Sequence, residues 1–404
     1  MTIALANELA VPTPQVWDRR GLPGWTYRSE ALLELEKREV FLTHWQIAGH
    51  ISDIPKPGAY ITFDLSEERA IVVRGDDDVV RAFNNLCRHR GGRVATEPKG
   101  QCKNALVCPF HGWVYNFDGS LRGPARPKSF GDFDKSSFGL KPIDVEIWHG
   151  FIFVRFRPGP QPAVAVLLAP YEQDMAAYKP EDMVPAGDFW LDRSPVNWKS
   201  VRDVDNEGYH VPMAHPGLQD LYGAGYRDFV FPNGLSVSKG PYNPHAGRRW
   251  SVRNYVNLAP EATWLPEPMR RLWSYYGIFP NNVITVTPET VQFYQEFPVS
   301  TGETILRSGV YRHAEEDRQL RVARYLATRI DRETTKEDQQ LTIWSNEAMK
   351  SSAFEGFHLS DLEYGVRNHH DQMRRLLPVM TLEAPPPEGR IAELNTEMRA
   401  GQKI

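Results

Sequence analysis

The chain has 404 residues, of which 47 are Lys or Arg and 51 are Asp or Glu, so its formal net charge is −4. This length predicts two or three domains, and the charge balance gives no electrostatic footprint for nucleic acid. The three Cys residues are too few for a disulfide framework. No apolar run is long enough to span a membrane, and Met1 to Gln15 show no pattern of a secretory signal. We therefore expect a cytoplasmic protein that binds neither nucleic acid nor membranes.

The hydrophobic pattern changes along the chain. Residues 28–45 place Leu, Val, Phe and Trp among charged residues at helical spacing. From residue 46 to about 156, short β-rich runs such as Ala70 to Arg74 and Gly150 to Val154 are broken by Gly, Pro and Asp. Residues 158–170 are rich in proline, which is typical of a connector, and a helix-plus-sheet region follows. The pattern predicts a compact β domain followed by a mixed domain.

Within the β-rich segment lies the most specific motif of the chain. Cys87 and His89 form one pair, Cys108 and His111 form another, and 18 residues separate His89 from Cys108. Two thiolates and two imidazoles in this order can hold a [2Fe-2S] cluster of Rieske type, with both Cys on one iron and both His on the other. A structural zinc site is the alternative, but zinc fingers pair Cys with Cys and His with His. The order of the ligands therefore favours the cluster.

The remaining cysteine limits what else the chain can carry. An all-Cys cluster needs four Cys, and only Cys102 is left after Cys87 and Cys108. The chain also lacks a strand followed by a GxGxxG turn and a helix, the pattern of dinucleotide-binding domains. Electrons for the cluster must then come from a separate protein. Cys102 itself is interpreted as a structural or partly exposed thiol.

A second motif in the mixed region is suited to a mononuclear metal. Glu207, His210 and His215 form E-x-x-H-x4-H, and two His with one distant carboxylate make the facial triad of non-haem Fe(II), with positions open for O2. Five residues of a regular helix would place the two His on different faces, so we expect Pro212 to break the helix between them. Glu207 is better placed as a partner of His210 than as a ligand. Without the cluster motif, such a His pair would more often be a surface or core feature.

Both motifs resemble those of Rieske non-haem iron oxygenases. The resemblance rests on Cys87-Arg88-His89-Arg90-Gly91, on Cys108 to Trp113, and on Asn197-Trp198-Lys199 ahead of Tyr209-His210, and it extends from about Trp45 to Pro378. It implies an α+β fold with a β-rich Rieske domain and a catalytic domain whose antiparallel sheet wraps a long C-terminal helix, the helix-grip (START-like) arrangement. The implied domains are residues 45–157 for the cluster and 158–404 for the mononuclear iron, with 1–44 belonging to the latter.

The resemblance also assigns the third iron ligand and a bridging residue. The family uses an Asp on the long C-terminal helix, within an acidic pair, and Glu337-Asp338 fits that register best. We assign Asp338; the competitors are Glu337, Asp331 and Glu347. By the same analogy, Glu207 would bond His210 on its own subunit and His111 on the next, and Asp203 or Asp205 could share this role.

The implied activity is that of a terminal oxygenase component. Such a protein uses O2 and electrons from a separate NAD(P)H-dependent reductase, directly or through a ferredoxin, to oxidise a small organic molecule. Family members assemble as rings of three, because the cluster and the iron of one subunit are too far apart for fast electron transfer. We therefore expect a homotrimer or an assembly built from trimers.

The substrate is indicated more weakly. The catalytic half is rich in aromatic residues, which suit an arene or a quaternary ammonium group, and Arg248, Arg249 and Arg253 could bind a carboxylate or simply lie on the surface. Glu207 and the segment Gly208 to Pro212 resemble the monooxygenase and demethylase branches, including those acting on betaines. We expect hydroxylation or oxidative demethylation of a betaine-like or carboxylated compound. The alternatives are an aromatic cis-dihydroxylating dioxygenase and, from another class, a ferredoxin-like carrier without catalysis.

Overall fold

The computed structural model describes residues 10–401 except 244, 246 and 388. The chain divides into two compact units. We call Phe41–Leu168 with Pro180–Pro185 the β unit, and Met1–Val40, Ala169–Lys179 and Ala186–Ile404 the sheet-helix unit. Among the described residues, no helix combines the length and apolar character needed to span a bilayer. The prediction that Met1 to Gln15 contain no secretory signal concerns a segment whose first nine residues lie outside the described part of the structure.

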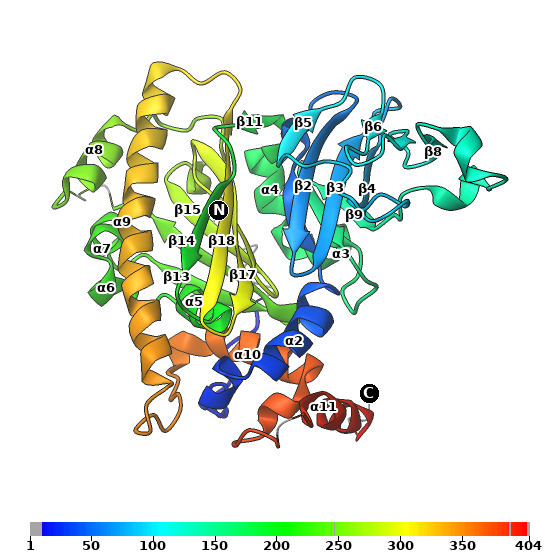
Figure 1. Ribbon diagram of the computed structural model, residues 1–404. Coiled ribbons are helices and arrows are strands. Elements are labelled where there is room, and N and C mark those ends of the chain that lie inside the picture. Colours follow the sequence, from blue (N-terminus) through cyan, green and yellow to red (C-terminus); the bar gives the residue numbers. More distant parts are fainter. Residues whose placement is uncertain (1–9, 244, 246, 388, 402–404) are drawn as a thin grey trace. The chain divides into compact units, whose positions relative to one another are not determined.

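The β unit contains three small antiparallel sheets (Figure 1). Their strand orders are β1-β10-β9, β4-β3-β2-β5 and β6-β7-β8. The strands are β1 Gln46–His50, β2 Ala59–Leu65, β3 Glu68–Arg74, β4 Val80–Asn84, β5 Lys99–Gln101, β6 Leu106–Val107, β7 Val114–Tyr115, β8 Leu121–Gly123, β9 Asp144–Trp148 and β10 Phe151–Arg155; a further strand is β11 Met183–Pro185. The unit has short helical segments at η3 Ile51–Asp53, η4 Pro127–Phe130, η5 Lys135–Phe138, α3 Val164–Leu167 and η7 Pro180–Asp182.

The β-rich runs of the sequence are the strands of this unit. Ala70 to Arg74 falls in β3, and residues 151–154 of the second run are buried within β10. Because β-branched and aromatic side chains pack well on a pleated surface, these strands hold the cores of their sheets. By its contacts, the proline-rich connector groups with the β unit up to Leu168.

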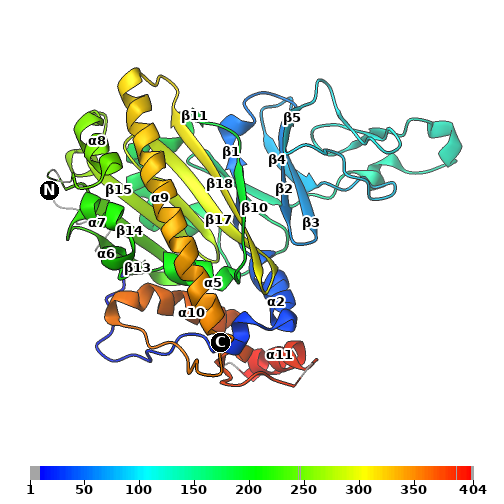
Figure 2. The ribbon, with the colours of Figure 1, turned by 60° about the vertical axis from the view of Figure 1, so that its left-hand side comes forward.

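The sheet-helix unit is built on one large antiparallel sheet (Figure 2). The strand order is β12-β18-β17-β16-β15-β14-β13. The strands are β12 Trp190–Ser194, β13 Arg227–Phe231, β14 Leu235–Pro241, β15 Leu272–Ile278, β16 Asn282–Val286, β17 Thr290–Ser300 and β18 Glu303–His313. From β13 to β18 each strand pairs with the next in sequence. The connections are short except the one from β14 to β15, which carries α8 (Trp250–Leu258) and η9 (Glu267–Met269).

Helix α9, Arg318–Ala348, runs along one face of this sheet (Figures 1 and 2). The Asp317 carboxylate accepts the Leu320 N–H and caps the helix. Ala323, Leu326 and Ile330 pack in one core with Trp273 of β15. On the opposite face, the Tyr171 hydroxyl donates to the carbonyls of Ser236 and Gly277. The large antiparallel sheet and the long helix α9 confirm the prediction of an α+β fold in which an antiparallel sheet packs against a long C-terminal helix.

Shorter helices surround the sheet. They are η1 Gly24–Tyr27, α2 Glu30–Glu36, the π-helical turn Lys37–Phe41 that ends in the β unit, η6 Ala169–Tyr171, α4 Glu172–Tyr178, α5 Trp198–Asp205, α6 Val211–Ala214, α7 Pro216–Tyr222, η8 Pro232–Gly234, α8 Trp250–Leu258, η9 Glu267–Met269, η10 Asp361–Glu363, α10 Tyr364–Leu376, η11 Pro378–Thr381 and α11 Ile391–Gly401. The helical pattern predicted over residues 28–45 thus corresponds to α2 and the π-helical turn after it.

Buried polar contacts fix the position of α5. Asn197 caps the helix by accepting the Lys199 N–H, and its own N–H donates to Asn346 Oδ1 on α9. The Lys199 ammonium lies 2.5 Å from Glu36 Oε1, and both side chains are almost fully buried. The Trp198 indole donates to the other oxygen of Glu36. The Asn-Trp-Lys segment therefore anchors the helix that leads into the second metal motif.

Candidate metal centres

The two Cys-His pairs lie on loops with the same backbone geometry. The Cys87 N–H donates to the Gly92 carbonyl at 2.7 Å, and the Cys108 N–H donates to the Trp113 carbonyl at 2.8 Å. In each loop, the glycine four residues after Cys donates its N–H back to the Cys carbonyl. These glycines, Gly91 and Gly112, have φ of 74° and 67°, a conformation that strongly favours glycine. Each loop therefore turns back on itself and presents its Cys and His side chains together.

The side chains of the two loops approach one another. Cys87 and Cys108 are buried, and burial raises the pKa of the Cys87 thiol. The ring of His89 stacks on Trp113 at 5.1 Å and meets the ring of His111 edge to face at 4.6 Å. His89 Nδ1 is buried without a hydrogen-bond partner among the described residues. A buried imidazole nitrogen without a partner, beside a second imidazole and two thiols, fits a [2Fe-2S] ligand set.

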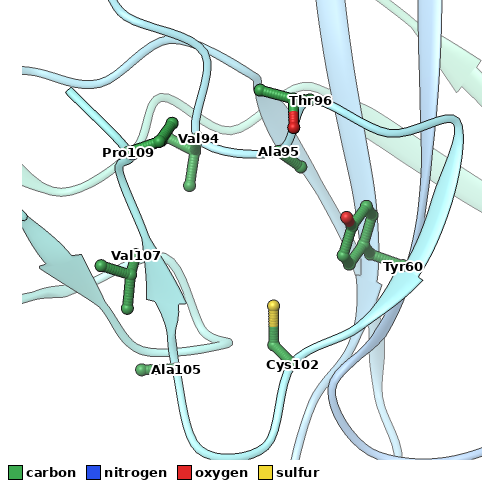
Figure 3. Close-up of a pocket in the computed structure, with 8 residues that line it drawn as sticks. All are labelled: Tyr60, Val94, Ala95, Thr96, Cys102, Ala105, Val107 and Pro109. Carbon is green, nitrogen blue, oxygen red and sulfur yellow. The ribbon is translucent and has the colours of Figure 1, made fainter.

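A tyrosine and a small pocket lie close to these loops. The Tyr115 hydroxyl is 3.2 Å from Cys87 Sγ and accepts the Arg88 N–H at 2.9 Å. The pocket in Figure 3, of about 260 Å³, is lined by Tyr60, Val94, Ala95, Thr96, Cys102, Ala105, Val107 and Pro109. Burial raises the pKa of the Cys102 thiol. Cys102 is half-buried at this pocket and packs against the hydrophobic core of the β unit.

The second motif is formed by helix ends. His210 precedes α6, and His215 lies between α6 and α7. The expectation that Pro212 breaks the helix between them is wrong, because Pro212 lies in the first turn of α6, where its missing N–H costs no bond. The break is at His215, whose φ of −117° and ψ of 76° are not helical. This kink turns both rings to one side.

The ligand atoms of His210, His215 and Asp338 converge. His215 Nε2 lies 3.0 Å from His210 Nε2 and 2.8 Å from Asp338 Oδ1, and the three candidate ligand atoms all fall within 4.8 Å of one another. Asp338 Oδ1 is buried and makes no properly oriented hydrogen bond. Three electron-pair donors that point at one another repel unless a cation lies between them. The geometry fits two His and one carboxylate around one metal ion.

The other ring nitrogen of each histidine contacts a carboxylate. His210 Nδ1 lies 2.6 Å from Glu207 Oε1, and His215 Nδ1 lies 2.9 Å from Glu337 Oε2. A carboxylate that accepts the Nδ1–H leaves the Nε2 lone pair for a metal. Glu337, considered above as a ligand, instead contacts the outer nitrogen of His215.

Protonation of the site follows from these contacts. Burial lowers the pKa of His210, but Asp338 and Glu207 outweigh burial and hold this pKa at about 10. Burial lowers the pKa of His215 as well, but Asp338 and Glu337 outweigh burial and raise this pKa above its usual value. In the absence of metal a proton is therefore shared among these groups, and a divalent cation would displace it.

The remaining acidic candidates have other partners. Asp203 accepts from the Tyr27 hydroxyl and contacts His370 Nε2. Asp205 accepts from Arg202 and from the Tyr294 hydroxyl. Glu347 is exposed on α9, and Asp331 lies two helical turns before Asp338. Of the acidic residues that precede the His pair, Glu207 is the one that contacts a ring of that pair.

One contributor was not anticipated from the sequence. Asp228 of β13 accepts the Gly208 N–H at 2.8 Å and the Ser238 hydroxyl at 2.6 Å. Burial raises its pKa to about 6. Asp228 thereby ties the loop that carries Glu207 to the sheet. No local pattern could have identified it, because it lies 20 residues from Gly208 on another element.

The fold and the two sites define a protein with cluster-binding loops in a β unit and a two-His-one-carboxylate centre against a large antiparallel sheet. Residues 44–135 match the family model of the Rieske [2Fe-2S] domain, and residues 178–378 match that of the ring-hydroxylating alpha subunit catalytic domain. The chain belongs to the Rieske ring-hydroxylating oxygenase alpha subunit family.

Individual relatives share parts of the sequence. The chain is 38% identical over 197 residues to the glycine betaine monooxygenase oxygenase subunit of Pseudomonas aeruginosa (strain UCBPP-PA14), covering 49% of this chain and 45% of that protein. It is 27% identical over 300 residues to the carnitine monooxygenase oxygenase subunit of Escherichia coli (strain K12), covering 73% and 75%. The match thus spans less than half the length of the betaine relative.

A solved structure shares the fold. The structure of a quaternary ammonium Rieske monooxygenase aligns with a TM-score of 0.73 at 24% identity, and the alignment covers 88% of this chain and 94% of that one. At this level of identity the likeness shows the fold alone.

Proposed function

We propose that this chain is the terminal oxygenase component of a Rieske oxygenase system. It would use O2 and electrons from a separate reductase to hydroxylate or oxidatively demethylate a small organic substrate. The observation that carries the proposal is the convergence of His210, His215 and Asp338 in a chain that also has two matching Cys-His loops. The domain division 1–44, 45–157 and 158–404 is proposed with it.

Each residue has a role in this proposal. When bound, the cluster would supply single electrons and the mononuclear iron would activate O2. The cluster ligands are Cys87, His89, Cys108 and His111, and the iron ligands are His210, His215 and Asp338. Glu207 holds the Nδ1 proton of His210 and keeps Nε2 free for the metal. We further propose that Glu207 bonds His111 of a neighbouring copy and so couples the two centres.

We propose a betaine-like quaternary ammonium compound as substrate. Support comes from the relatives, one of which is a glycine betaine and the other a carnitine monooxygenase oxygenase subunit. Oxidation of an N-methyl carbon would give a carbinolamine that loses formaldehyde, so the reaction would be a demethylation. Arg248, Arg249 and Arg253 are exposed residues at the start of α8 or just before it, which favours their interpretation as surface charges.

The proposal includes partners and a location. A reductase that takes electrons from NAD(P)H would reduce the cluster, directly or through a ferredoxin, because three Cys leave no ligands for an all-Cys cluster in this chain. A homotrimer or trimer-based assembly would bring the cluster of one copy to the iron of the next. The cytoplasm is the proposed compartment.

Two alternative functions can be tested against this one. A cis-dihydroxylating dioxygenase would use the same ligands, and product analysis with benzoates against betaines and N-methyl amino acids separates the two. A Rieske ferredoxin-like carrier would bind two iron ions per chain, whereas an oxygenase binds about three by ligand count. Iron analysis of the purified protein therefore tests for the mononuclear iron that an oxygenase needs and a carrier lacks, and it requires no substrate.

Variants of the ligands complete the test. His89→Ala or His111→Ala should abolish the visible absorption of the cluster. His210→Ala should keep that absorption and remove both the third iron and oxygen-dependent turnover. Full turnover by His210→Ala, supported by unchanged iron content, would refute the catalytic assignment.

A further inference from the structure

A series of aromatic rings in the sheet-helix unit begins beside the loop that leads to His210. The ring of Tyr226 packs against Gly208 of this loop, since a methyl group added to the glycine would lie 2.1 Å from Cε1 of the ring. Gly208 is two residues before His210. Val211, on the other side of His210, belongs to the hydrophobic core that contains the remaining rings of the series. The aromatic core therefore reaches the residues that flank a proposed iron ligand.

The series continues from ring to ring. Tyr222 stacks on Tyr226 with ring centroids 5.5 Å apart, and it meets Trp273 edge to face at 6.2 Å. Trp273 in turn meets Tyr255 at 5.5 Å. We call these four residues the aromatic row. Tyr and Trp lose an electron far more readily than Phe or aliphatic side chains do, and rings in contact are close enough for an electron to pass between them. The row is therefore a path for one-electron transfer.

The hydroxyl of Tyr255 ends the row in a group of buried hydrogen bonds. It donates to the two carboxylate oxygens of Glu289, at 3.1 and 3.2 Å. It accepts the indole N–H of Trp273 at 2.8 Å and is hydrogen-bonded to the hydroxyl of Tyr242. A hydroxyl has one donor and two acceptor sites, so Tyr242 donates in that bond. The proton of Tyr255 thus points at Glu289.

Glu289 can accept this proton. It lies in the turn between β16 and β17 and is 2% exposed. Among the described residues, no Lys, Arg or His forms an ion pair with it. Burial raises its pKa to about 7, so near neutral pH its carboxylate takes up and releases a proton readily. A phenol that loses an electron becomes a strong acid, and its oxidation is much easier where a base takes the proton. Glu289 is such a base for Tyr255.

We propose that the aromatic row is a relay that removes an oxidising equivalent from the iron site when no substrate is oxidised. In each event Tyr255 loses one electron, which passes along the row to the iron that O2 has oxidised. The O–H bond of Tyr255 breaks, its proton moves to Glu289, and a neutral tyrosyl radical remains. One electron from a small reductant, such as ascorbate or a thiol, and the proton returned by Glu289 restore the tyrosine. The relay rests on the function proposed above, which supplies the oxidant.

The test uses iron-loaded protein without substrate and hydrogen peroxide as the oxidant. Peroxide takes up two electrons and two protons to become water, and here one electron comes from the iron and one from the aromatic row. Samples are frozen soon after mixing and examined by electron paramagnetic resonance. We expect a tyrosyl radical in the wild type and none in iron-free protein. Ring-deuterated tyrosine should narrow the signal, whereas deuterated tryptophan should not.

Variants separate a relay from ordinary packing, because packing needs the rings but not the pair of hydroxyl and carboxylate. Tyr255→Phe keeps the ring, and its tyrosyl signal should fall by about tenfold or more, the effect of one lost hydrogen bond to a charged group on a rate. The hydroxyl of Tyr222 cannot take over, since it contacts the hydroxyl of Tyr275 rather than a carboxylate. Glu289→Gln and Trp273→Phe should lower the signal as well, the first by removing the base and the second by interrupting the row.

A second readout is damage to the protein. Mass spectrometry of the peptide that contains residues 207–215 should show more oxidised side chains in Tyr255→Phe than in the wild type after the same exposure to peroxide. Tyr171→Phe is the matched control, because it removes another buried tyrosine hydroxyl of this unit, one that donates to backbone carbonyls. Its radical signal and its damage should equal those of the wild type. Thermal unfolding and iron analysis of each variant confirm that folded, loaded proteins are compared.

The outcomes distinguish the relay from the proposed function. An undiminished tyrosyl signal in Tyr255→Phe or in Trp273→Phe overturns the relay, and so does equal damage in Tyr255→Phe and the wild type. A wild type that oxidises an ammonium substrate but forms no radical overturns the relay and leaves the proposed function standing. A radical that is lost in Tyr255→Phe and kept in Tyr171→Phe supports the relay, and if no substrate is then oxidised, the proposed function alone is overturned.

Discussion

Replacing Glu207 by Gln tests the proposal that its carboxylate connects the two proposed metal centres. Glu207 Oε1 contacts His210 Nδ1 at 2.6 Å, and Oε2 accepts the backbone N–H of His210 at 3.1 Å. A glutamine has one acceptor oxygen and one NH2 donor. In either orientation the NH2 faces an N–H, so at least one of these bonds is lost, and so is the capacity to accept from a second imidazole.

The size of the effect follows from the bonds removed. A hydrogen bond to a charged group contributes about 1.5–3 kcal/mol, which corresponds to about 10- to 150-fold in a rate or a binding constant. Because Glu207 is not a ligand, Glu207→Gln should hold both metals when iron is supplied in excess. Electron transfer from the cluster to the mononuclear iron should fall by at least the amount above, and further if His111 of a neighbouring copy also loses its acceptor.

The assay is single turnover with a pre-reduced cluster. Substrate and O2 are added, and reoxidation is followed by the cluster's visible absorption after iron occupancy has been measured. Glu337→Gln is the matched control, since it removes the equivalent contact from His215 and should weaken iron binding about 10- to 100-fold without blocking electron transfer in the reloaded protein. Rapid reoxidation in fully loaded Glu207→Gln would refute the bridge and turn attention to Asp203 or Asp205.

Three further predictions concern stability and the cluster. Lys199→Met leaves Glu36 buried with a charge but no cation and should cost about 3–5 kcal/mol in urea unfolding; adding Glu36→Gln should restore most of it. Burial raises the pKa of Asp331 to about 7 from 3.8, so the folded state keeps this proton to higher pH than the unfolded chain. The stability that the protonated Asp331 carboxyl contributes is lost as pH rises from about 4 to 7. The free energy of unfolding of Asp331→Asn, measured in urea, should therefore rise relative to that of the wild type by up to about 4 kcal/mol between pH 4 and pH 8. Tyr115→Phe removes a hydroxyl 3.2 Å from Cys87 Sγ; if this bond contributes about 1 kcal/mol to the reduced state, the cluster potential should fall by roughly 40 mV in redox titration.

The sequence was most informative where a residue type has few other uses. Cys and His at short spacing have a limited chemistry, so the cluster loops could be predicted from residue type and spacing. The prediction of the pair His210 and His215 as metal ligands depended in addition on the presence of the cluster motif. The β-rich runs and the long C-terminal helix also followed from periodicity and family resemblance. The choice of Asp338 depended on family resemblance, because an acidic pair on a helix is normally a solvated face. The structure places its carboxylate beside both rings.

Other contributors could not be found from the sequence. Glu337 lies 122 residues from His215, and its position relative to Asp338 suits either a ligand or an outer partner. Which one it is depends on how α9 is rotated against the sheet. Asp228 is an acid in a strand, a placement that no spacing rule connects with Glu207. The error at Pro212 has a similar origin, since proline can end one helix or begin another.

Buried ion pairs hold the helix that leads to the proposed iron site. Two buried ion pairs, Lys199 with Glu36 and Arg202 with Glu296, hold α5, and the loop that carries Glu207 and His210 follows this helix directly. A metal site requires its ligands within about half an ångström of their productive positions, which rigid elements provide better than free loops. Loss of either ion pair should therefore raise the rate of iron loss as well as lower stability.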